Sequence, residues 1–259
     1  MNLLIYVFLA LYFFISLVWL VSLLTKDASI VDRFWGLLFI LLSTGYLIIA
    51  EESGWRAVLV TGLVAVWGLR LSIHIHMRNR GEGEDYRYKM MRQSNGSRFW
   101  WYSFFSVFAL QASLAIIISI PLLLAVFIGG PREVLWSDLV GISLWLVGFV
   151  FEAGADWQLR KFKSDPKNKG KLLTTGFWSL SRHPNYFGDA CLWFGYFLLG
   201  LSAPFGWLGA IGPVIMFLFL RYVSGAALLE KGLKKSKPGY EDYERNTPVF
   251  FPKFWIGKV

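Results

Sequence analysis

The nine residues SRHPNYFGD, Ser181 to Asp189, form a strongly polar stretch directly before an apolar segment. Pro184 disfavours helix at His183 and suits the first turn of a following helix, where free backbone N–H groups attract anions. Asn185 and Asp189 are four residues apart and face the same way from such a helix. Asn185 can donate and accept hydrogen bonds, and Asp189 needs a partner in apolar surroundings. The stretch therefore predicts a binding site for a polar, anionic ligand.

A second polar stretch, FEAGADWQLRKFK, directly follows the uncharged residues 139–151. Glu152, Asp156, Arg160 and Lys163 are spaced by four, four and three residues, which aligns them on one face of a helix. Ion pairs on a helix surface would also explain this spacing. The two cations are suited to phosphates, and Asp156 to a ribose hydroxyl or an amide. We expect this stripe to contribute to the same ligand site.

The segment RNRGEGEDYRYKMMR, residues 78–92, interleaves arginines with tyrosines. Aromatic rings with arginines can hold a flat base and its phosphates, whereas a topology-setting cationic loop needs no such rings. GEGEDY does not match the GxGxxG fingerprint and no strand precedes it, so a Rossmann site is excluded. We expect a loop here, with Arg80, Asp85, Arg87 and Tyr88 as ligand contacts.

Other ionisable residues lie within or beside apolar segments. Asp32 and Arg33 precede one such segment, where they are either a helix-start carboxylate beside an orienting cation or an acid at the mouth of a cavity. Arg70 lies well inside another segment, which favours a role as partner of an anionic group. The remaining expected ligand contacts are Lys171, Arg182, His183, Tyr186, Arg221, Tyr240 and Arg245.

The composition places these residues in a membrane protein. Hydrophobic residues make up 56% of the chain and charged residues 17%, below the roughly 25% usual in soluble domains. The single cysteine excludes an internal disulfide framework, and no Cys/His cluster predicts a metal. The first apolar segment lacks a basic leader and a cleavage site, so we interpret it as a retained span. The predicted spans are 2–24, 34–50, 55–77, 99–128, 137–157, 185–202 and 205–227.

Seven spans place 22 of the 26 lysines and arginines on one side of the membrane, and only Arg56 and Arg132 on the other. This asymmetry predicts an all-α, polytopic protein with its N-terminus outside and its C-terminus in the cytoplasm. It also explains the net charge of +9 without a nucleic-acid partner. We find no repeat or long linker and expect one membrane domain over 1–259, with the cofactor-binding part mainly in 70–98 and 150–259.

Together these features indicate an enzyme that uses a cytosolic nucleotide cofactor on a lipid-soluble substrate. No Ser–His–Asp arrangement, P-loop or HExxH motif occurs. The residues alone do not distinguish NADPH from S-adenosylmethionine.

SRHPNYFGD and the later PGYEDYERNTPVFFP resemble the C-terminal domain of the steroid 5α-reductase family, and DRFWG and GEDYRY are similar to stretches of its bacterial members. The resemblance runs from about residue 25 to the end. It implies a seven-helix membrane fold, NADPH, and reduction of the Δ4 double bond of a 3-oxo steroid. Isoprenylcysteine and phospholipid methyltransferases carry similar RHP-x-Y-x-G turns.

The resemblance also implies roles for particular residues. The family's cofactor contacts fall here on Arg70, Asp156, Arg160, Lys163, Asn185 and Asp189. Asp189 stands where glutamate is common. Of the family's catalytic Glu–Tyr pair, Asp32 falls near the glutamate position, with Arg33 beside it, and Trp67 falls near the tyrosine position, although tryptophan cannot donate a proton to substrate.

The expected reaction is hydride transfer to the β-carbon of an enone, with a donor stabilising the enolate oxygen. The expected substrate is a steroid-like enone that enters a monomeric protein from the bilayer, in contact with membrane lipids. Loop lengths fit a bacterial inner membrane, with the active site facing the cytoplasm. An S-adenosylmethionine-dependent methyltransferase and a non-catalytic lipid-binding protein are the alternatives.

Overall fold

The computed structural model describes residues 2–223 and 225–253, and in these ranges the chain is helical and contains no strand. Position 224, inside the predicted span 205–227, and Lys258, in the predicted cationic tail, lie outside the described residues. The chain divides into two compact units. Unit 1 comprises residues 1–133 and 200–209, and unit 2 comprises residues 134–199 and 210–259. The expectation of one domain stays a prediction.

Unit 1 is formed by the following segments: α1 (Asn2–Thr25), α2 (Ile30–Arg33), α3 (Trp35–Ile49), α4 (Trp55–Arg78), α5 (Tyr86–Asn95), η1 (Gly96–Arg98), α6 (Phe99–Ser103), η2 (Phe104–Ala109), α7 (Leu110–Ile118), α8 (Ile120–Leu123), η3 (Leu124–Ile128) and the start of η5 (Gly206–Ala210). Unit 2 is formed by α9 (Trp136–Ser164), η4 (Pro166–Asn168), α10 (Phe177–Leu180), α11 (Pro184–Gly200), α12 (Ile211–Leu218), η6 (Phe219–Val223), α13 (Ala226–Ser236) and α14 (Tyr240–Asn246).

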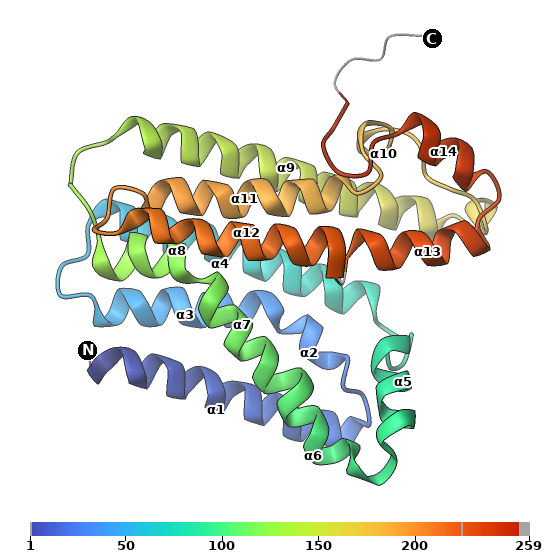
Figure 1. Cartoon of the computed structure of the whole chain (residues 1–259), viewed down its shortest axis with the longest axis horizontal. Helices are drawn as coiled ribbons and strands as arrows, with labels where there is room; N and C mark the ends of the chain where they lie inside the picture. Colours follow the sequence, from blue (N-terminus) through green and yellow to red (C-terminus); the bar gives the residue numbers. More distant parts are fainter. Residues whose placement is uncertain (1, 224, 254–259) are drawn as a thin grey trace. The chain divides into compact units, whose positions relative to one another are not determined.

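Small residues allow the helices of unit 1 to pack closely. Helices α3 and α4 run side by side, with α1 next to α3 (Figure 1). A Cβ atom on Gly36 would lie only 2.3 Å from the carbonyl oxygen of Gly68, so the two backbones are in contact there. Between helices surrounded by lipid, such close packing replaces the hydrophobic effect as the source of attraction.

The predicted span 99–128 is broken where Pro121 suggested a kink or an end. Helix α7 ends at Ile118, and Pro121 occupies the first turn of α8. Ser119, between the two helices, shares a hydrogen bond of 2.9 Å with the buried Tyr46 hydroxyl. Proline lacks an N–H and clashes with the preceding turn, which explains the break.

The prediction of a loop over residues 78–92 is wrong for its second half, because α5 begins at Tyr86. The carboxylate of Asp85 accepts a hydrogen bond of 2.9 Å from the backbone N–H of Arg87 and so caps the helix. Aspartate is among the best residues for this position. The charged composition of the segment concealed a local helix-start signal.

Among the residues that the structure describes, four helices are long and apolar enough to cross a membrane: Leu3–Thr25, Trp55–Arg78, the continuous run Tyr86–Ile118 and Trp136–Ser164. Many large apolar side chains of these helices face outward, such as Phe13 and Leu24 on α1. The chain is therefore an integral membrane protein. Helices Trp35–Ile49 and Gly206–Tyr222 are apolar but shorter, so the count of seven spans and the orientation stay predictions.

In unit 2, glycines bring α9 and α11 into backbone contact along their length (Figure 1). A Cβ atom on Gly188 of α11 would lie 2.5 Å from both the Glu152 nitrogen and the Gly148 oxygen of α9. On the same pair of helices, a Cβ atom on Gly195 would lie 2.8 Å from the Gly141 oxygen. These contacts fix the depth at which the polar residues of the two helices face each other.

Replacing Gly188 with alanine should therefore destabilise the protein by about 1–3 kcal/mol, because the clash involves backbone atoms that cannot rotate away. The matched control is Gly62→Ala on α4, where a Cβ atom would meet no atom within 4 Å and helix propensity favours alanine by up to about 1 kcal/mol. Thermal unfolding in detergent measures both variants. Equal melting temperatures would contradict the close contact of α9 and α11.

Candidate functional site: two polar clusters

In unit 2 the turn before α11 is held by the C-terminal segment. As predicted, Pro184 is the first residue of α11. The backbone N–H of Arg182 donates to the Pro248 oxygen at 2.9 Å, and that of Lys253 donates to the Leu180 oxygen at 2.8 Å. The buried Ser181 hydroxyl donates to the Phe250 oxygen at 2.8 Å. The conformation of SRHPN thus depends on a segment about 70 residues later in the chain.

Carboxylates of α13 and α14 face the basic residues of the same turn. Glu230 lies 3.2 Å from Nε of Arg182 and 3.0 Å from Nε2 of His183, and all three side chains are largely buried. Glu244 lies 3.1 Å from Nη1 of Arg182 and 2.9 Å from Nζ of Lys234. Arg182 and His183, expected as ligand contacts, are therefore engaged by carboxylates of the tail.

The charges set the protonation of these carboxyl groups. Burial acts to raise the pKa of Glu230, but the hydrogen bond from His183 and the charge of Arg182 outweigh it, so the pKa lies below its ordinary value of 4.5. The hydrogen bond from Lys234 likewise lowers the pKa of Glu244. Burial, followed by the charge of Glu230, raises the pKa of the Tyr240 hydroxyl to about 12. Glu230 and Glu244 are thus ionised near neutral pH, and Tyr240 is a neutral phenol.

Asp156 of α9 and Asn185 of α11 meet as the sequence suggested. The Asn185 amide nitrogen donates to Oδ1 of Asp156 at 3.1 Å. In the part of the chain that the structure describes, the buried Oδ1 atom of Asn185 accepts no hydrogen bond. A buried acceptor of this kind calls for an N–H or O–H donor, which a carboxamide or a ribose hydroxyl of a ligand would supply.

The other predicted residues lie along the same two helices, Glu152, Arg160 and Lys163 on α9 and Asp189 on α11. Glu152, Asp156 and Asp189 are buried, between 4% and 9% exposed, whereas Arg160 and Lys163 further along α9 are exposed. A single helix therefore presents buried carboxylates and, one to two turns later, exposed cations. This order matches a ligand with a neutral hydrogen-bonding end and an anionic end.

In unit 1 four side chains form what we call the Asp32 cluster: Asp32, Arg87, Tyr88 and Gln111. The Tyr88 hydroxyl donates to Oδ1 of Asp32 at 2.8 Å, and Nη2 of Arg87 lies 3.1 Å from Oδ2. The Gln111 amide donates to Oδ1 of Asp32 at 3.4 Å and to the Tyr88 oxygen at 3.3 Å. The cluster thus joins helices α2, α5 and α7.

Burial raises the pKa of the Asp32 carboxyl, and the opposing influence of Arg87 and of the Tyr88 hydrogen bond does not cancel it. The carboxyl is therefore a weaker acid than an ordinary aspartate. The result is a buried phenol and a carboxyl with raised proton affinity in direct contact. Such a pair can donate hydrogen bonds to an oxygen atom on which negative charge develops.

A protein family described as "Protein of unknown function (DUF1295)" matches residues 18–247. The chain therefore belongs to this family.

Individual relatives of this DUF1295 chain differ in the extent of the match. An uncharacterized protein of Schizosaccharomyces pombe is 28% identical over 92% of the chain and 76% of its own length. A Delta(14)-sterol reductase of Arabidopsis thaliana is 32% identical over 31% of the chain and 25% of its own length. A probable O-methyltransferase of Ustilaginoidea virens is 46% identical over 18% of the chain and 16% of its own length. The chain thus spans only about a quarter or less of these two enzymes.

Other predicted site residues of the DUF1295 chain lie in ordinary structural surroundings. Trp67 is fully buried and packs against Phe39 at 5.7 Å between ring centroids. Arg33 pairs with Asp27 at 3.3 Å. Arg70, on α4, has two buried guanidinium nitrogens. Arg80 and Lys171 are exposed.

In unit 2 the other expected contacts have partners of their own. The Tyr186 ring stacks on His183 at 5.3 Å, and the guanidinium of Arg221 lies 4.9 Å from the Tyr222 ring. Arg245 is exposed and lies 3.8 Å from Glu241. The structure therefore assembles two groups from the predicted residues, the Asp156–Asn185 pair and the Asp32 cluster.

Three residues that the sequence analysis did not select take part in these clusters. Glu230 and Glu244 neutralise the turn, and their only sequence signal was acidity in a basic tail. Gln111 was detectable as a lone amide in an apolar segment.

Proposed function

We propose that this protein is an integral membrane reductase that uses NADPH to reduce the carbon–carbon double bond of an α,β-unsaturated ketone. The main support for the proposal is the Asp156–Asn185 pair, because the buried Asn185 Oδ1 accepts no hydrogen bond from the described residues and could accept one from a cofactor. Partial similarity to a Delta(14)-sterol reductase supports the reaction class. The steroid-like 3-oxo-Δ4 substrate is the more specific part of the proposal.

In unit 2 the proposed cofactor contacts follow the chemistry of each side chain. Asn185 would accept from the carboxamide or ribose, with Asp156 holding its amide in place. Arg160 and Lys163 would bind phosphates. Bound NADPH supplies the hydride for the double bond. The density of cations in the connections supports a cofactor that carries several phosphates, and it supports a cytoplasmic site in a bacterial inner membrane.

In unit 1 we assign activation of the ketone to Tyr88 and Asp32. The phenol would turn from Asp32 toward the ketone oxygen and stabilise the negative charge that develops there. The positive charge of Arg87 adds to this effect. Asp32 then holds the phenol ready and can return a proton to it. Tyr88 would thus take the donor role for which Trp67, a core residue without a suitable proton, is unsuited.

The test is cofactor binding by the purified protein in detergent, with NADPH, NADH and S-adenosylmethionine titrated in parallel. We expect saturable NADPH binding that Asn185→Ala weakens about tenfold or more, because a buried hydrogen-bonded amide is lost. Asn246→Ala is the matched control, since that exposed amide bonds only within α14. Unchanged NADPH binding in Asn185→Ala would show that Asn185 does not contact the cofactor and would contradict the proposal.

One alternative has a specific observation in its favour. The similarity to a probable O-methyltransferase, short as it is, suits a methyltransferase that uses S-adenosylmethionine. Saturable S-adenosylmethionine binding without NADPH binding would favour a methyltransferase over the reductase. Absence of both would leave a non-catalytic lipid-binding protein.

A further inference from the structure

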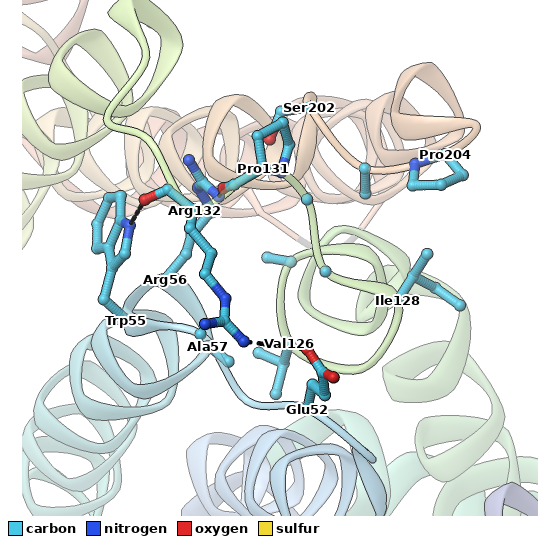
Figure 2. A pocket seen from close by; sticks show the side chains of 15 residues that line it. Glu52, Trp55, Arg56, Ala57, Val126, Ile128, Pro131, Arg132, Ser202 and Pro204 are labelled. Carbon is cyan, nitrogen blue, oxygen red and sulfur yellow. Dashed lines mark hydrogen bonds and ion pairs between the residues drawn. The ribbon is translucent and has the colours of Figure 1, made fainter.

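Unit 1 contains a cavity of about 620 Å³, which is within the usual size range of small-molecule sites. Three connections enclose it: residues 52–57 at the start of α4, residues 125–132 at the end of η3, and residues 202–204 (Figure 2). Asp32 lies on α2, just before the start of α3, and this cavity lies beyond the end of α3. The 15 residues of α3 separate the two by about 22 Å, so the cavity is distinct from the Asp32 cluster.

The cavity wall is held in place by Arg56, which is 4% exposed. Its guanidinium donates to the Pro131 oxygen at 2.7 Å and to the Glu133 oxygen at 3.1 Å, and it lies 4.7 Å from the ring of Trp55. The Trp55 ring nitrogen donates to the Arg132 oxygen at 2.8 Å. The turn 131–133 is thus fastened to the first turn of α4, which makes the cavity a preformed site.

Two opposite charges stand at the rim. Arg132 reaches toward Glu52, with 3.1 Å between Nη2 and Oε2, as Figure 2 shows. These side chains are 80% and 83% exposed, so the ion pair contributes little to stability and each charge can readily exchange its partner for a ligand group. Two lining residues, Gly130 and Ser202, are in close contact: a Cβ atom on Gly130 would lie 2.6 Å from the Ser202 hydroxyl oxygen. The rim therefore offers a cation, an anion and a narrow polar floor.

The surroundings indicate an amphiphilic ligand. The apolar lining includes Val126, Ile128 and Pro204. Next to it, Phe205 and Trp207 are 71% and 67% exposed, as aromatic side chains are at a membrane–water boundary. Phe205 has a φ of 58°, a left-handed conformation that is unfavourable for a bulky residue. An exposed aromatic residue thus directly follows Pro204, the last lining residue of the cavity.

We propose that this cavity binds the headgroup of a zwitterionic phospholipid such as phosphatidylethanolamine. The phosphate would pair with Arg132 and the ammonium group with Glu52, while the acyl chains would lie along Ile128 and Phe205. A purely anionic headgroup would meet the like charge of Glu52, and an uncharged diacylglycerol would leave both charges unused. Because the cavity is remote from the Asp32 cluster, this inference is independent of the proposed reductase activity.

The test is native mass spectrometry of the full-length protein released from detergent with equal amounts of phosphatidylethanolamine, phosphatidylglycerol and diacylglycerol. We expect one phosphatidylethanolamine to be retained at least tenfold more than either competitor. Soluble glycerophosphoethanolamine should compete with it, and inorganic phosphate should not. Preferential retention of phosphatidylglycerol, equal retention of diacylglycerol, or displacement by inorganic phosphate would overturn the proposal.

A charge exchange isolates the role of the rim. The double variant Glu52→Arg with Arg132→Glu keeps an exposed ion pair but reverses its direction, so melting temperature should be unchanged and phosphatidylethanolamine retention should fall about tenfold. The matched control exchanges the exposed pair on α14, Glu241→Arg with Arg245→Glu, and should bind the lipid normally. Normal lipid retention by the rim exchange would overturn the assignment of phosphate to Arg132 and ammonium to Glu52.

Discussion

Replacing Tyr88 with phenylalanine should lower the rate of double-bond reduction by about 10²- to 10³-fold, while NADPH binding stays unchanged. The substitution removes only the hydroxyl that now donates to Asp32, and a donor aimed at a developing oxyanion is commonly worth that factor. Because the interaction strengthens in the transition state, kcat should fall and the KM of the ketone should change little. Steady-state kinetics with a 3-oxo-Δ4 steroid, together with NADPH titration, measures both.

The control for this prediction is Tyr86→Phe. Tyr86 lies two residues away in the first turn of α5, but it is 73% exposed, so its hydroxyl should be dispensable. Asp32→Asn provides a second comparison, because asparagine keeps the shape of the carboxyl group and loses its acidity. Full turnover in Tyr88→Phe would exclude Tyr88 as the donor, and full turnover in Asp32→Asn would exclude Asp32 from an acid role.

Replacing Glu230 with glutamine should destabilise unit 2 by about 2–3 kcal/mol. The change leaves the largely buried Arg182 with only Glu244 as a carboxylate partner and deprives His183 of its acceptor, and removing one member of a buried charged network is costly. Limited proteolysis of the segment after α12 and thermal unfolding report the loss. Glu241→Gln is the control, because its ion pair with Arg245 is exposed and should contribute almost nothing.

The Glu230 carboxyl group also makes the free energy of unfolding depend on pH. Since the pKa of Glu230 is lower in the folded protein than its ordinary 4.5, its contribution is present above about pH 4.5 and is lost as the pH falls through the folded-state pKa. Wild-type protein should therefore lose stability in acid more steeply than Glu230→Gln. Parallel acid denaturation curves for the two proteins would contradict this role of Glu230.

Local rules in the sequence were sufficient for several elements. Apolar segments predicted the four described helices that are long enough to span a membrane, because lipid requires each spanning backbone to satisfy its own hydrogen bonds. Pro121 predicted the break before α8, and Pro184 predicted the start of α11. The spacing of Glu152, Asp156 and Arg160 placed them on one face of a helix, and all three lie on α9. Each of these inferences depends on residues within one or two turns of each other.

Only the tertiary structure decided which polar groups meet. Asp32 and Tyr88 are 56 residues apart, and His183 and Glu230 are 47 apart, so no local spacing relates them. Within unit 1, the cavity likewise combines three connections that are distant in sequence. Helix packing through glycines such as Gly36 and Gly68 sets these distances. By itself the sequence determined the helices and the chemistry each one carries. Helix packing determined which polar groups are in contact, because a buried charge is stabilised only by a complementary group that the fold places next to it.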